Sequence, residues 1–209
     1  MKKILILNAL IIAILLSCKK ETTIINNPLH DQIYYRDISP DTTFNSVQYY
    51  LTFPLGIGEP FPEDTTVTYL LDIDSNFISD YEFSVNHYFY MQTSHDKYYH
   101  YTNQVKSLSP TDSIAVISKN SSNALALKEG DIISNNLNYC NAANLLLNLQ
   151  GVPISYVFSG DYLVIKRCIN NTTMLGWIKL KLAQKNGLTI EEFAFNKTNS
   201  NSIICGQKY

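Results

Sequence analysis

The sequence predicts a mainly β protein, a two-layer antiparallel β-sandwich with at most one short helix. Tyrosine and phenylalanine are abundant, at 15 and 9 of the 209 residues, and aromatic and β-branched side chains suit a pleated, half-buried surface. Apolar and polar residues alternate in several short stretches, which is typical of strands with one face in a core. Asn, Ser and Gly separate these stretches as turns. Many short strands of this kind favour a sandwich.

The chain opens with a segment typical of exported proteins. Lys2 and Lys3 precede an apolar run over residues 4–16, which is shorter than the ~20 residues that a membrane-spanning helix needs. A basic start and an apolar middle that ends in a small residue indicate an export signal. We therefore expect residues 1–17 to be a signal peptide. An ordinary secretory signal that is cut nearby is the alternative.

The end of this segment, Leu15-Leu16-Ser17-Cys18, resembles the lipobox of bacterial lipoproteins. The resemblance implies that Cys18 becomes the N-terminus and carries a diacylglycerol, usually with a further acyl chain such as palmitate. Several chains, at ~0.8 kcal/mol per buried methylene, make a lasting membrane anchor. Residue 19 is Lys, not the Asp that retains many lipoproteins in the inner membrane. The resemblance thus implies the outer membrane, with the periplasmic or external face left open.

Composition limits the number of domains and the kind of partner. We expect residues 18–44 to be a polar tether and residues 45–209 to form one domain, because single domains commonly run ~100–200 residues. Removing residues 1–17 takes away two lysines and leaves 16 − 2 = 14 basic residues against 18 acidic ones, a net charge of −4. No basic patch points to nucleic acid.

The strands of the first half are predicted by alternation. Val47, Tyr49, Leu51 and Phe53 alternate with polar or less apolar neighbours, so residues 46–53 form a half-buried strand. The same pattern predicts strands over residues 67–73, 83–91, 98–105 and 113–118. A turn followed by a strand is expected at residues 130–134.

The second half contains the single helical candidate. Residues 141–149 place Ala and Leu side chains on one broad face, and Gly151 can cap the C-terminal end. Strands over residues 156–158 and 162–169 flank Ser159-Gly160-Asp161, which indicates a hairpin. Further strands are expected over residues 174–182, 189–195 and 203–204.

The C-terminal third carries a recurring pattern. Its parts are Tyr162-Leu163-Val164-Ile165, Gly176-Trp177-Ile178, Glu192-Phe193-Ala194-Phe195-Asn196 and Ile203-Ile204-Cys205-Gly206, preceded upstream by an Asp-rich segment over residues 71–80. The pattern resembles uncharacterised cell-envelope lipoproteins of Bacteroidota. The resemblance implies a β-sandwich lipoprotein at the surface or in the periplasm, and it brings no known activity and no catalytic residues.

The Asp-rich segment is a candidate metal site. Asp72, Asp74, Asn76 and Asp80 supply hard oxygen ligands at a spacing that can surround one Ca²⁺. The segment is not an EF-hand, since Phe77 and Phe83 stand where that loop needs Gly and Glu. The alternative is a solvated turn in which the acids cap backbone N–H groups.

Three aromatic residues are candidate ligand-binding positions. Alternation places Trp177 opposite the more apolar face of its strand, and it places Tyr88 and Tyr90 on the polar side of another strand. An outward aromatic platform suits a glycan or an envelope protein. The alternative is that a loop or the tether covers Trp177.

Cysteines and histidines leave alternatives open. Besides Cys18 the chain has Cys140, Cys168 and Cys205, which can include one disulfide of unassigned pairing or three small buried thiols. His87, His95 and His100 can in principle bind zinc. His87 shares its strand face with apolar residues, so we expect it to pack in the core.

The sequence favours a binding or structural module of the cell envelope, not an enzyme. No G-x-S-x-G, H-E-x-x-H or phosphate-binding glycine loop occurs. Glu191 and Glu192 are expected on opposite faces of one strand, which would prevent joint acid and base catalysis. The alternative is a glycan-acting hydrolase whose site is distributed over loops.

Overall fold

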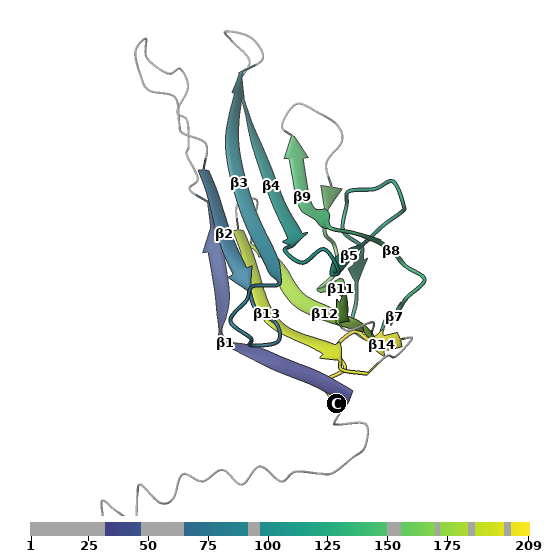
Figure 1. The fold of residues 1–209 in the computed structure, drawn as a ribbon. Coiled ribbons are helices and arrows are strands. Elements are labelled where there is room, and N and C mark those ends of the chain that lie inside the picture. Colours follow the sequence, from purple (N-terminus) through teal and green to yellow (C-terminus); the bar gives the residue numbers. More distant parts are fainter. Residues whose placement is uncertain are drawn as a thin grey trace, which may run out of the picture.

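A computed structural model of the chain describes residues 32–46, 65–91, 97–149, 156–169, 172–183, 187–198 and 202–209. These residues form fourteen strands and no α-helix, which confirms the mainly β fold. Two antiparallel sheets pack face to face as a sandwich (Figure 1). Within the described residues, no helix has the length and apolarity to cross a membrane.

The larger sheet combines the first described strand with strands from the second half of the chain. Its strand order is β1 (Ile33–Asn45), β13 (Gly187–Asn196), β12 (Thr172–Ala183), β11 (Tyr162–Ile169), β5 (Ser113–Val116) and β8 (Asn138–Cys140), and β6 (Ala126–Leu127) also pairs with β11. The second sheet has the order β10 (Tyr156–Val157), β9 (Ala142–Leu149), β4 (Lys97–Ser107), β3 (Tyr81–Met91) and β2 (Thr65–Leu71). The pairings between neighbouring strands are antiparallel.

The main core lies between the two sheets. Alternate residues of each strand enter it, such as Phe83 and Val85 on β3 and Ile178 and Leu180 on β12, and all four are fully buried. Burial of this kind stabilises a fold by roughly 1.5–3 kcal/mol for each large apolar side chain. The alternation that predicted these strands is therefore the pattern that builds the core.

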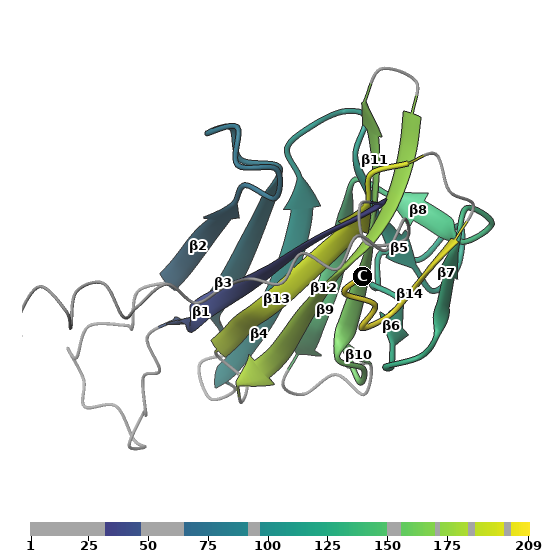
Figure 2. The ribbon, with the colours of Figure 1, turned by 90° about the horizontal axis from the view of Figure 1, so that it is seen from below.

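A second, smaller core covers the outer face of the larger sheet. Two short strands, β7 (Ile132–Ser134) and β14 (Ser202–Ile204), pair with each other and lie against β12 outside the two main layers (Figure 2). The buried residues here are Ile33, Ala115, Ile133, Tyr162, Val164, Leu175, Trp177, Ala194, Ile203 and Cys205. The larger sheet thus has apolar side chains on both faces.

The tether predicted over residues 18–44 is wrong for its second part, because Ile33–Asn45 form β1 of the larger sheet. The register of β1 on β13 shifts between Asp37 and Thr42, and this irregular stretch contains Pro40. An edge strand tolerates proline and bulges because only one of its sides must pair. The domain therefore starts before residue 45.

The predicted helix over residues 141–149 is also wrong. These residues form β9, which pairs with β4 on one side and β10 on the other. Ala143 and Leu145 enter the main core, so pairing on both sides overrides the helical spacing of the Ala and Leu residues.

The predicted hairpin around Ser159-Gly160-Asp161 is wrong as well. Strand β10 pairs with β9 in the second sheet, whereas β11 pairs with β12 in the larger one. The segment between them passes from one layer to the other. The strand predicted over residues 162–169 occurs with the predicted ends, and the other predicted strands occur with shifted ends. The exception is residues 46–53, of which the structure describes only Ser46.

Candidate functional site

The loop that joins β2 to β3, residues 72–80, is held by its own side chains. Asp72 accepts hydrogen bonds from the backbone N–H groups of Asn76 (3.3 Å) and Phe77 (2.8 Å). The Asn76 side-chain oxygen accepts from the N–H of Ile78 at 2.7 Å. Such Asx contacts satisfy backbone donors that the turn leaves unpaired.

Two apolar side chains stand in solvent on this loop. Phe77 is 99% exposed and Ile78 is 69% exposed. Phe77 also has a φ of +69°, and Ser75 has a φ of +60°, a left-handed conformation that residues other than glycine adopt rarely. The loop therefore holds an exposed aromatic ring in a costly backbone conformation, as binding loops often do.

Arg167 on β11 lies at the base of the loop among three carboxylates. Its guanidinium contacts Asp80 at 2.6 Å, Asp112 at 3.1 Å and Asp74 at 3.2 Å. The side chains of Arg167, Asp80 and Asp112 are almost fully buried, whereas that of Asp74 is 23% exposed. We call these four residues the Arg167 cluster.

The position of Arg167 follows from strand geometry. Leu163 and Ile165 precede it on the same face of β11 and enter the main core, so alternation directs Arg167 toward the space between the sheets. Asp80 directly precedes β3 of the second sheet, and Asp112 directly precedes β5 of the larger one. The guanidinium therefore joins both layers at this end of the sandwich, and removal of one partner would leave a buried charge.

The charges of the cluster shift one another's protonation. Burial raises the pKa of Asp80, although the N–H of Ile73 and the charge of Arg167 act in the opposite direction. Burial by itself disfavours the charge of Arg167, but Asp80, Asp112 and Asp74 outweigh it and raise the pKa of the guanidinium. Arg167 therefore stays charged, and Asp80 is the carboxylate that takes up a proton more readily than in water.

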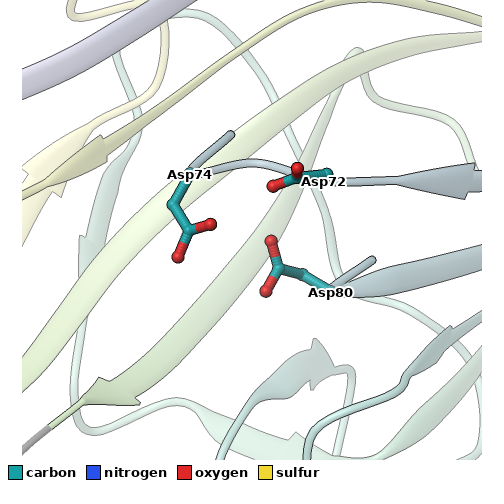
Figure 3. A group of neighbouring side chains, drawn as sticks. All are labelled: Asp72, Asp74 and Asp80. Atoms are coloured by element: carbon teal, nitrogen blue, oxygen red, sulfur yellow. The ribbon is translucent and has the colours of Figure 1, made fainter. Parts of the chain in front are cut away.

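The candidate calcium ligands converge only in part. Asp72, Asp74 and Asp80 each place one oxygen within 4.8 Å of the others, and their carboxylates point toward one another (Figure 3). The Asn76 side-chain oxygen bonds the loop backbone.

Every carboxylate oxygen of the three aspartates already has a donor. The donors are the N–H groups of Ile73, Asn76 and Phe77 and the guanidinium of Arg167. The geometry thus matches the capped turn that was the alternative, with an arginine as cation. Calcium stays a prediction.

Two hollows flank the loop. One of about 440 Å³ has Ile78, Leu108 and Ile169 among its lining residues, together with the whole Arg167 cluster. The other, of about 360 Å³, is lined by Leu70 and Phe77 among others. The five apolar residues named here are all exposed, and clustered exposed apolar side chains mark interaction sites more often than scattered ones do.

Trp177 and Tyr88 lie in different sheets and are not brought together. Alternation correctly separates Trp177 from the main core, but the indole is fully buried, because Tyr162, Tyr35 and the β7–β14 pair cover it. The predicted platform at Trp177 is therefore wrong, and the alternative of a covered ring holds. Tyr88 is half-buried beside His100, with ring centroids 5.4 Å apart. The side chain of Tyr90 lies outside the described residues.

Glu191 and Glu192 share one face, contrary to the prediction. Ile190 and Phe193 both enter the main core, and the pairing of β13 with β12 shifts register at this point. This β-bulge turns both carboxylates to the outer face. Lys179 contacts Glu191 at 3.3 Å and Glu192 at 3.6 Å.

Lysines neutralise these two carboxylates, and a tyrosine donates a hydrogen bond to one of them. Lys181 also contacts Glu191, and Glu192 accepts hydrogen bonds of 2.6 Å from both Tyr35 and Lys208. Burial opposes the effect, but these donors outweigh it and lower the pKa of each glutamate. We call this set the Glu192 cluster. Neither carboxyl group is poised to hold the proton that a glycosidase acid needs.

Of the remaining cysteine and histidine candidates, the structure describes Cys140, Cys168, Cys205, His87 and His100. Cys140, Cys168 and Cys205 are free thiols, and burial raises the pKa of the Cys205 thiol to about 12, which makes it unreactive. His87 is buried and stacked on Tyr101 at 4.8 Å, as expected for a core histidine. Cys18 and His95 lie outside the described residues.

Sequence reasoning missed Arg167, Asp112 and the exposure of Phe77. A signal for Arg167 was present, because alternation puts it in line with Leu163 and Ile165, and a charge on a core face must be paired. No local pattern indicates its partners, which lie 55 to 93 residues away in sequence.

Comparison of the chain with protein-family models, with curated proteins and with solved structures finds no match in any of the three. The resemblance to Bacteroidota lipoproteins therefore stays a prediction from the residues that carry it.

Proposed function

We propose that this chain is a lipid-anchored lipoprotein of the outer membrane that binds a protein partner through the β2–β3 loop end of its sandwich. The exposed Phe77 and Ile78 on a loop fixed by Asx contacts carry the proposal. A fixed loop loses little conformational freedom on binding, so more of the contact energy contributes to affinity.

A protein partner suits this end better than a glycan does. Sugar rings stack on broad exposed aromatic faces, and Trp177, the strongest candidate for such a face, is buried. Exposed aromatic and aliphatic side chains beside polar groups resemble the centre and rim of protein interfaces instead.

The alternative of a glycan-acting hydrolase has less support. Glu191 and Glu192 share the outer face of the larger sheet, which is the arrangement that joint acid and base catalysis would need. Their lysine partners hold them as carboxylates, so they favour a structural role on the outer face.

Photo-crosslinking in cells tests the binding end. The full chain is expressed with p-benzoylphenylalanine in place of Phe77, and a second version carries it in place of Ile132, which is exposed on β7. We expect a discrete protein adduct from position 77 that position 132 does not give. The adduct should disappear when Ile78→Asp is added. Equal adducts at both positions, or none at 77, would reject the proposed binding end.

Mass spectrometry of the N-terminal peptide tests the anchor separately. We expect a diacylglycerol-modified Cys18 and loss of membrane association in a Cys18→Ser variant. An unmodified Cys18 in membrane-extracted protein would reject the lipoprotein assignment without affecting the crosslinking result.

A further inference from the structure

The larger hollow beside the loop has an apolar mouth and a charged base. Ile78, Leu108 and Ile169 are exposed at its opening. Asp80, Asp112 and Arg167 are buried among the residues that line it, and Asp74 is the carboxylate with the greatest access to solvent.

The base of the hollow is short of positive charge. Three carboxylates face one guanidinium, which leaves a formal charge of −2 for the Arg167 cluster. The low-dielectric surroundings strengthen the attraction of this charge for a cation.

A polar group near the base also has unused bonding capacity. The Tyr81 hydroxyl is fully buried and has no hydrogen-bond partner among the described residues. It lies close enough to Asp112, Arg167 and Asp80 to interact with their charges. Tyr81 belongs to the main core and is not among the residues that line the hollow, so the attraction of the hollow for a cation rests on the excess negative charge of the Arg167 cluster.

From this arrangement we infer that the hollow binds a basic side chain, a lysine or an arginine, presented by the protein partner. The apolar mouth contacts the methylene stem, and Asp74 with the negative base receives the charged group. Long basic side chains combine an apolar stem with a charged end, so they match both parts of the hollow. This inference rests on the proposed function, because it names the chemistry that the same end of the sandwich recognises.

Two small probes that differ only in charge test the inference. Nα-acetyl-lysine methylamide and Nα-acetyl-norleucine methylamide share a stem, and only the first carries an ammonium. Each is titrated into the full chain held in phosphatidylcholine nanodiscs, and isoleucine methyl NMR signals are followed. Ile78 and Ile169 report on the hollow, and Ile132 on β7 is the internal control.

We expect the lysine probe to shift the Ile78 and Ile169 signals in a saturable way while Ile132 stays unchanged. The norleucine probe should bind about fivefold more weakly or worse. Asp74→Asn should weaken the lysine probe by about threefold to tenfold and leave the norleucine probe unaffected. Asp161→Asn is the matched control, because Asp161 is exposed and directly precedes β11, and it should change neither titration.

Equal binding of the two probes, or an equal effect of the two Asp→Asn variants, would overturn the inference. Calcium chloride that shifts Ile78 and Ile169 when the lysine probe does not would also overturn it, because the site would then prefer a metal ion. If either result is found and position 77 still gives its crosslink, the proposed binding end holds and only the basic side chain of the partner is rejected. Loss of that crosslink would instead reject the proposed function.

Discussion

The Arg167 and Glu192 clusters use the same kinds of side chain in opposite proportions. In the Arg167 cluster three carboxylates share one cation in a mostly buried site. In the Glu192 cluster two carboxylates share Lys179, Lys181 and Lys208, whose side chains are partly exposed.

The difference in balance appears in the protonation of the acids. The pKa of Asp80 is raised by burial, whereas the pKa values of Glu191 and Glu192 are lowered by their lysine and tyrosine partners, which outweigh burial. A cluster with enough counter-charge is complete within the domain. A buried cluster with too little counter-charge keeps a net charge, and of these two clusters the Arg167 cluster meets that description.

The largest expected effect is on the Arg167 cluster. Arg167→Met leaves three carboxylates without their cation and should lower the free energy of unfolding by about 3–5 kcal/mol. Urea denaturation at pH 7 measures it, with Lys181→Met as control because that side chain is 62% exposed and its pair should contribute less than about 1 kcal/mol. Similar losses in both variants would show that burial does not distinguish the two clusters. If the methionine variant folds too poorly to measure, Arg167→Lys replaces it, and it should still lower the free energy of unfolding by more than Lys181→Met does.

The Glu192 cluster should be less costly to break. Glu192→Gln weakens the charge-assisted bonds from Tyr35 and Lys208 and should lower the free energy of unfolding by about 1–2 kcal/mol. The same urea experiment measures this value, with the half-buried Glu82 changed to Gln as the matched control. A loss as large as that of Arg167→Met would contradict the proposed order.

Acid titration should separate the clusters by the sign of their effects. The folded pKa of Glu192 is below its ordinary value of 4.5, so its contribution to stability is present above about pH 4.5 and is lost as the pH falls through the folded pKa. Asp80 behaves oppositely. Its folded pKa lies above 3.8, so the folded state takes up a proton first, and its contribution is present below pH 3.8 and lost as the pH rises through the folded pKa.

The free energy of unfolding against pH, from pH 7 to pH 3, therefore gives opposite results for two variants. Glu192→Gln should make the loss of stability in acid shallower, and Asp80→Asn should make it steeper. Each slope changes by at most about 1.4 kcal/mol per pH unit for one proton. Slopes that change in the same direction would mean that the two acids do not differ as described.

The smallest expected effect concerns calcium. Because Arg167 and backbone N–H groups already bond the oxygens of Asp72, Asp74 and Asp80, calcium chloride and EDTA should give Tm values within about 1 °C of each other. A metal that bound only the folded chain would stabilise it by mass action. A rise of more than about 4 °C, which corresponds to more than about 1 kcal/mol for a domain of this size, would establish calcium binding at millimolar concentration.

The sandwich could be predicted from sequence because most strands alternate in register with the core. The predictions for β1 and β9 failed because backbone pairing, and not the pattern of apolar residues, determines the structure of these two segments. Strand β1 lies at a sheet edge and needs backbone pairing more than an apolar face, so its polar sequence resembled a tether. In β9, pairing with both neighbours overrode a spacing that suits a helix.

Only the part of the candidate site that lies within one loop could be predicted from the sequence. The spacing of Asp72, Asp74 and Asp80 indicated that their oxygens would converge, and they do. The cation among them is Arg167, which the fold brings from a distant strand, and local spacing holds no information on such pairs. Trp177 and the Glu191–Glu192 bulge were misjudged for a related reason, since a third layer and a register shift are properties of the pairing and not of one strand.

The early start of β1 limits how far the domain can lie from a membrane that holds Cys18. Tyr34 and Arg36 on β1 both contact Ser75 in the β2–β3 loop, at 3.4 Å and 3.2 Å, so the chain enters the domain next to that loop. Only 14 residues, 19–32, lie between Cys18 and Ile33, and the 33 − 18 = 15 residue steps from one to the other allow a maximum reach of about 50 Å at full extension. With a lipid on Cys18, the loop would work within that distance of the bilayer, and a partner would have to meet it there.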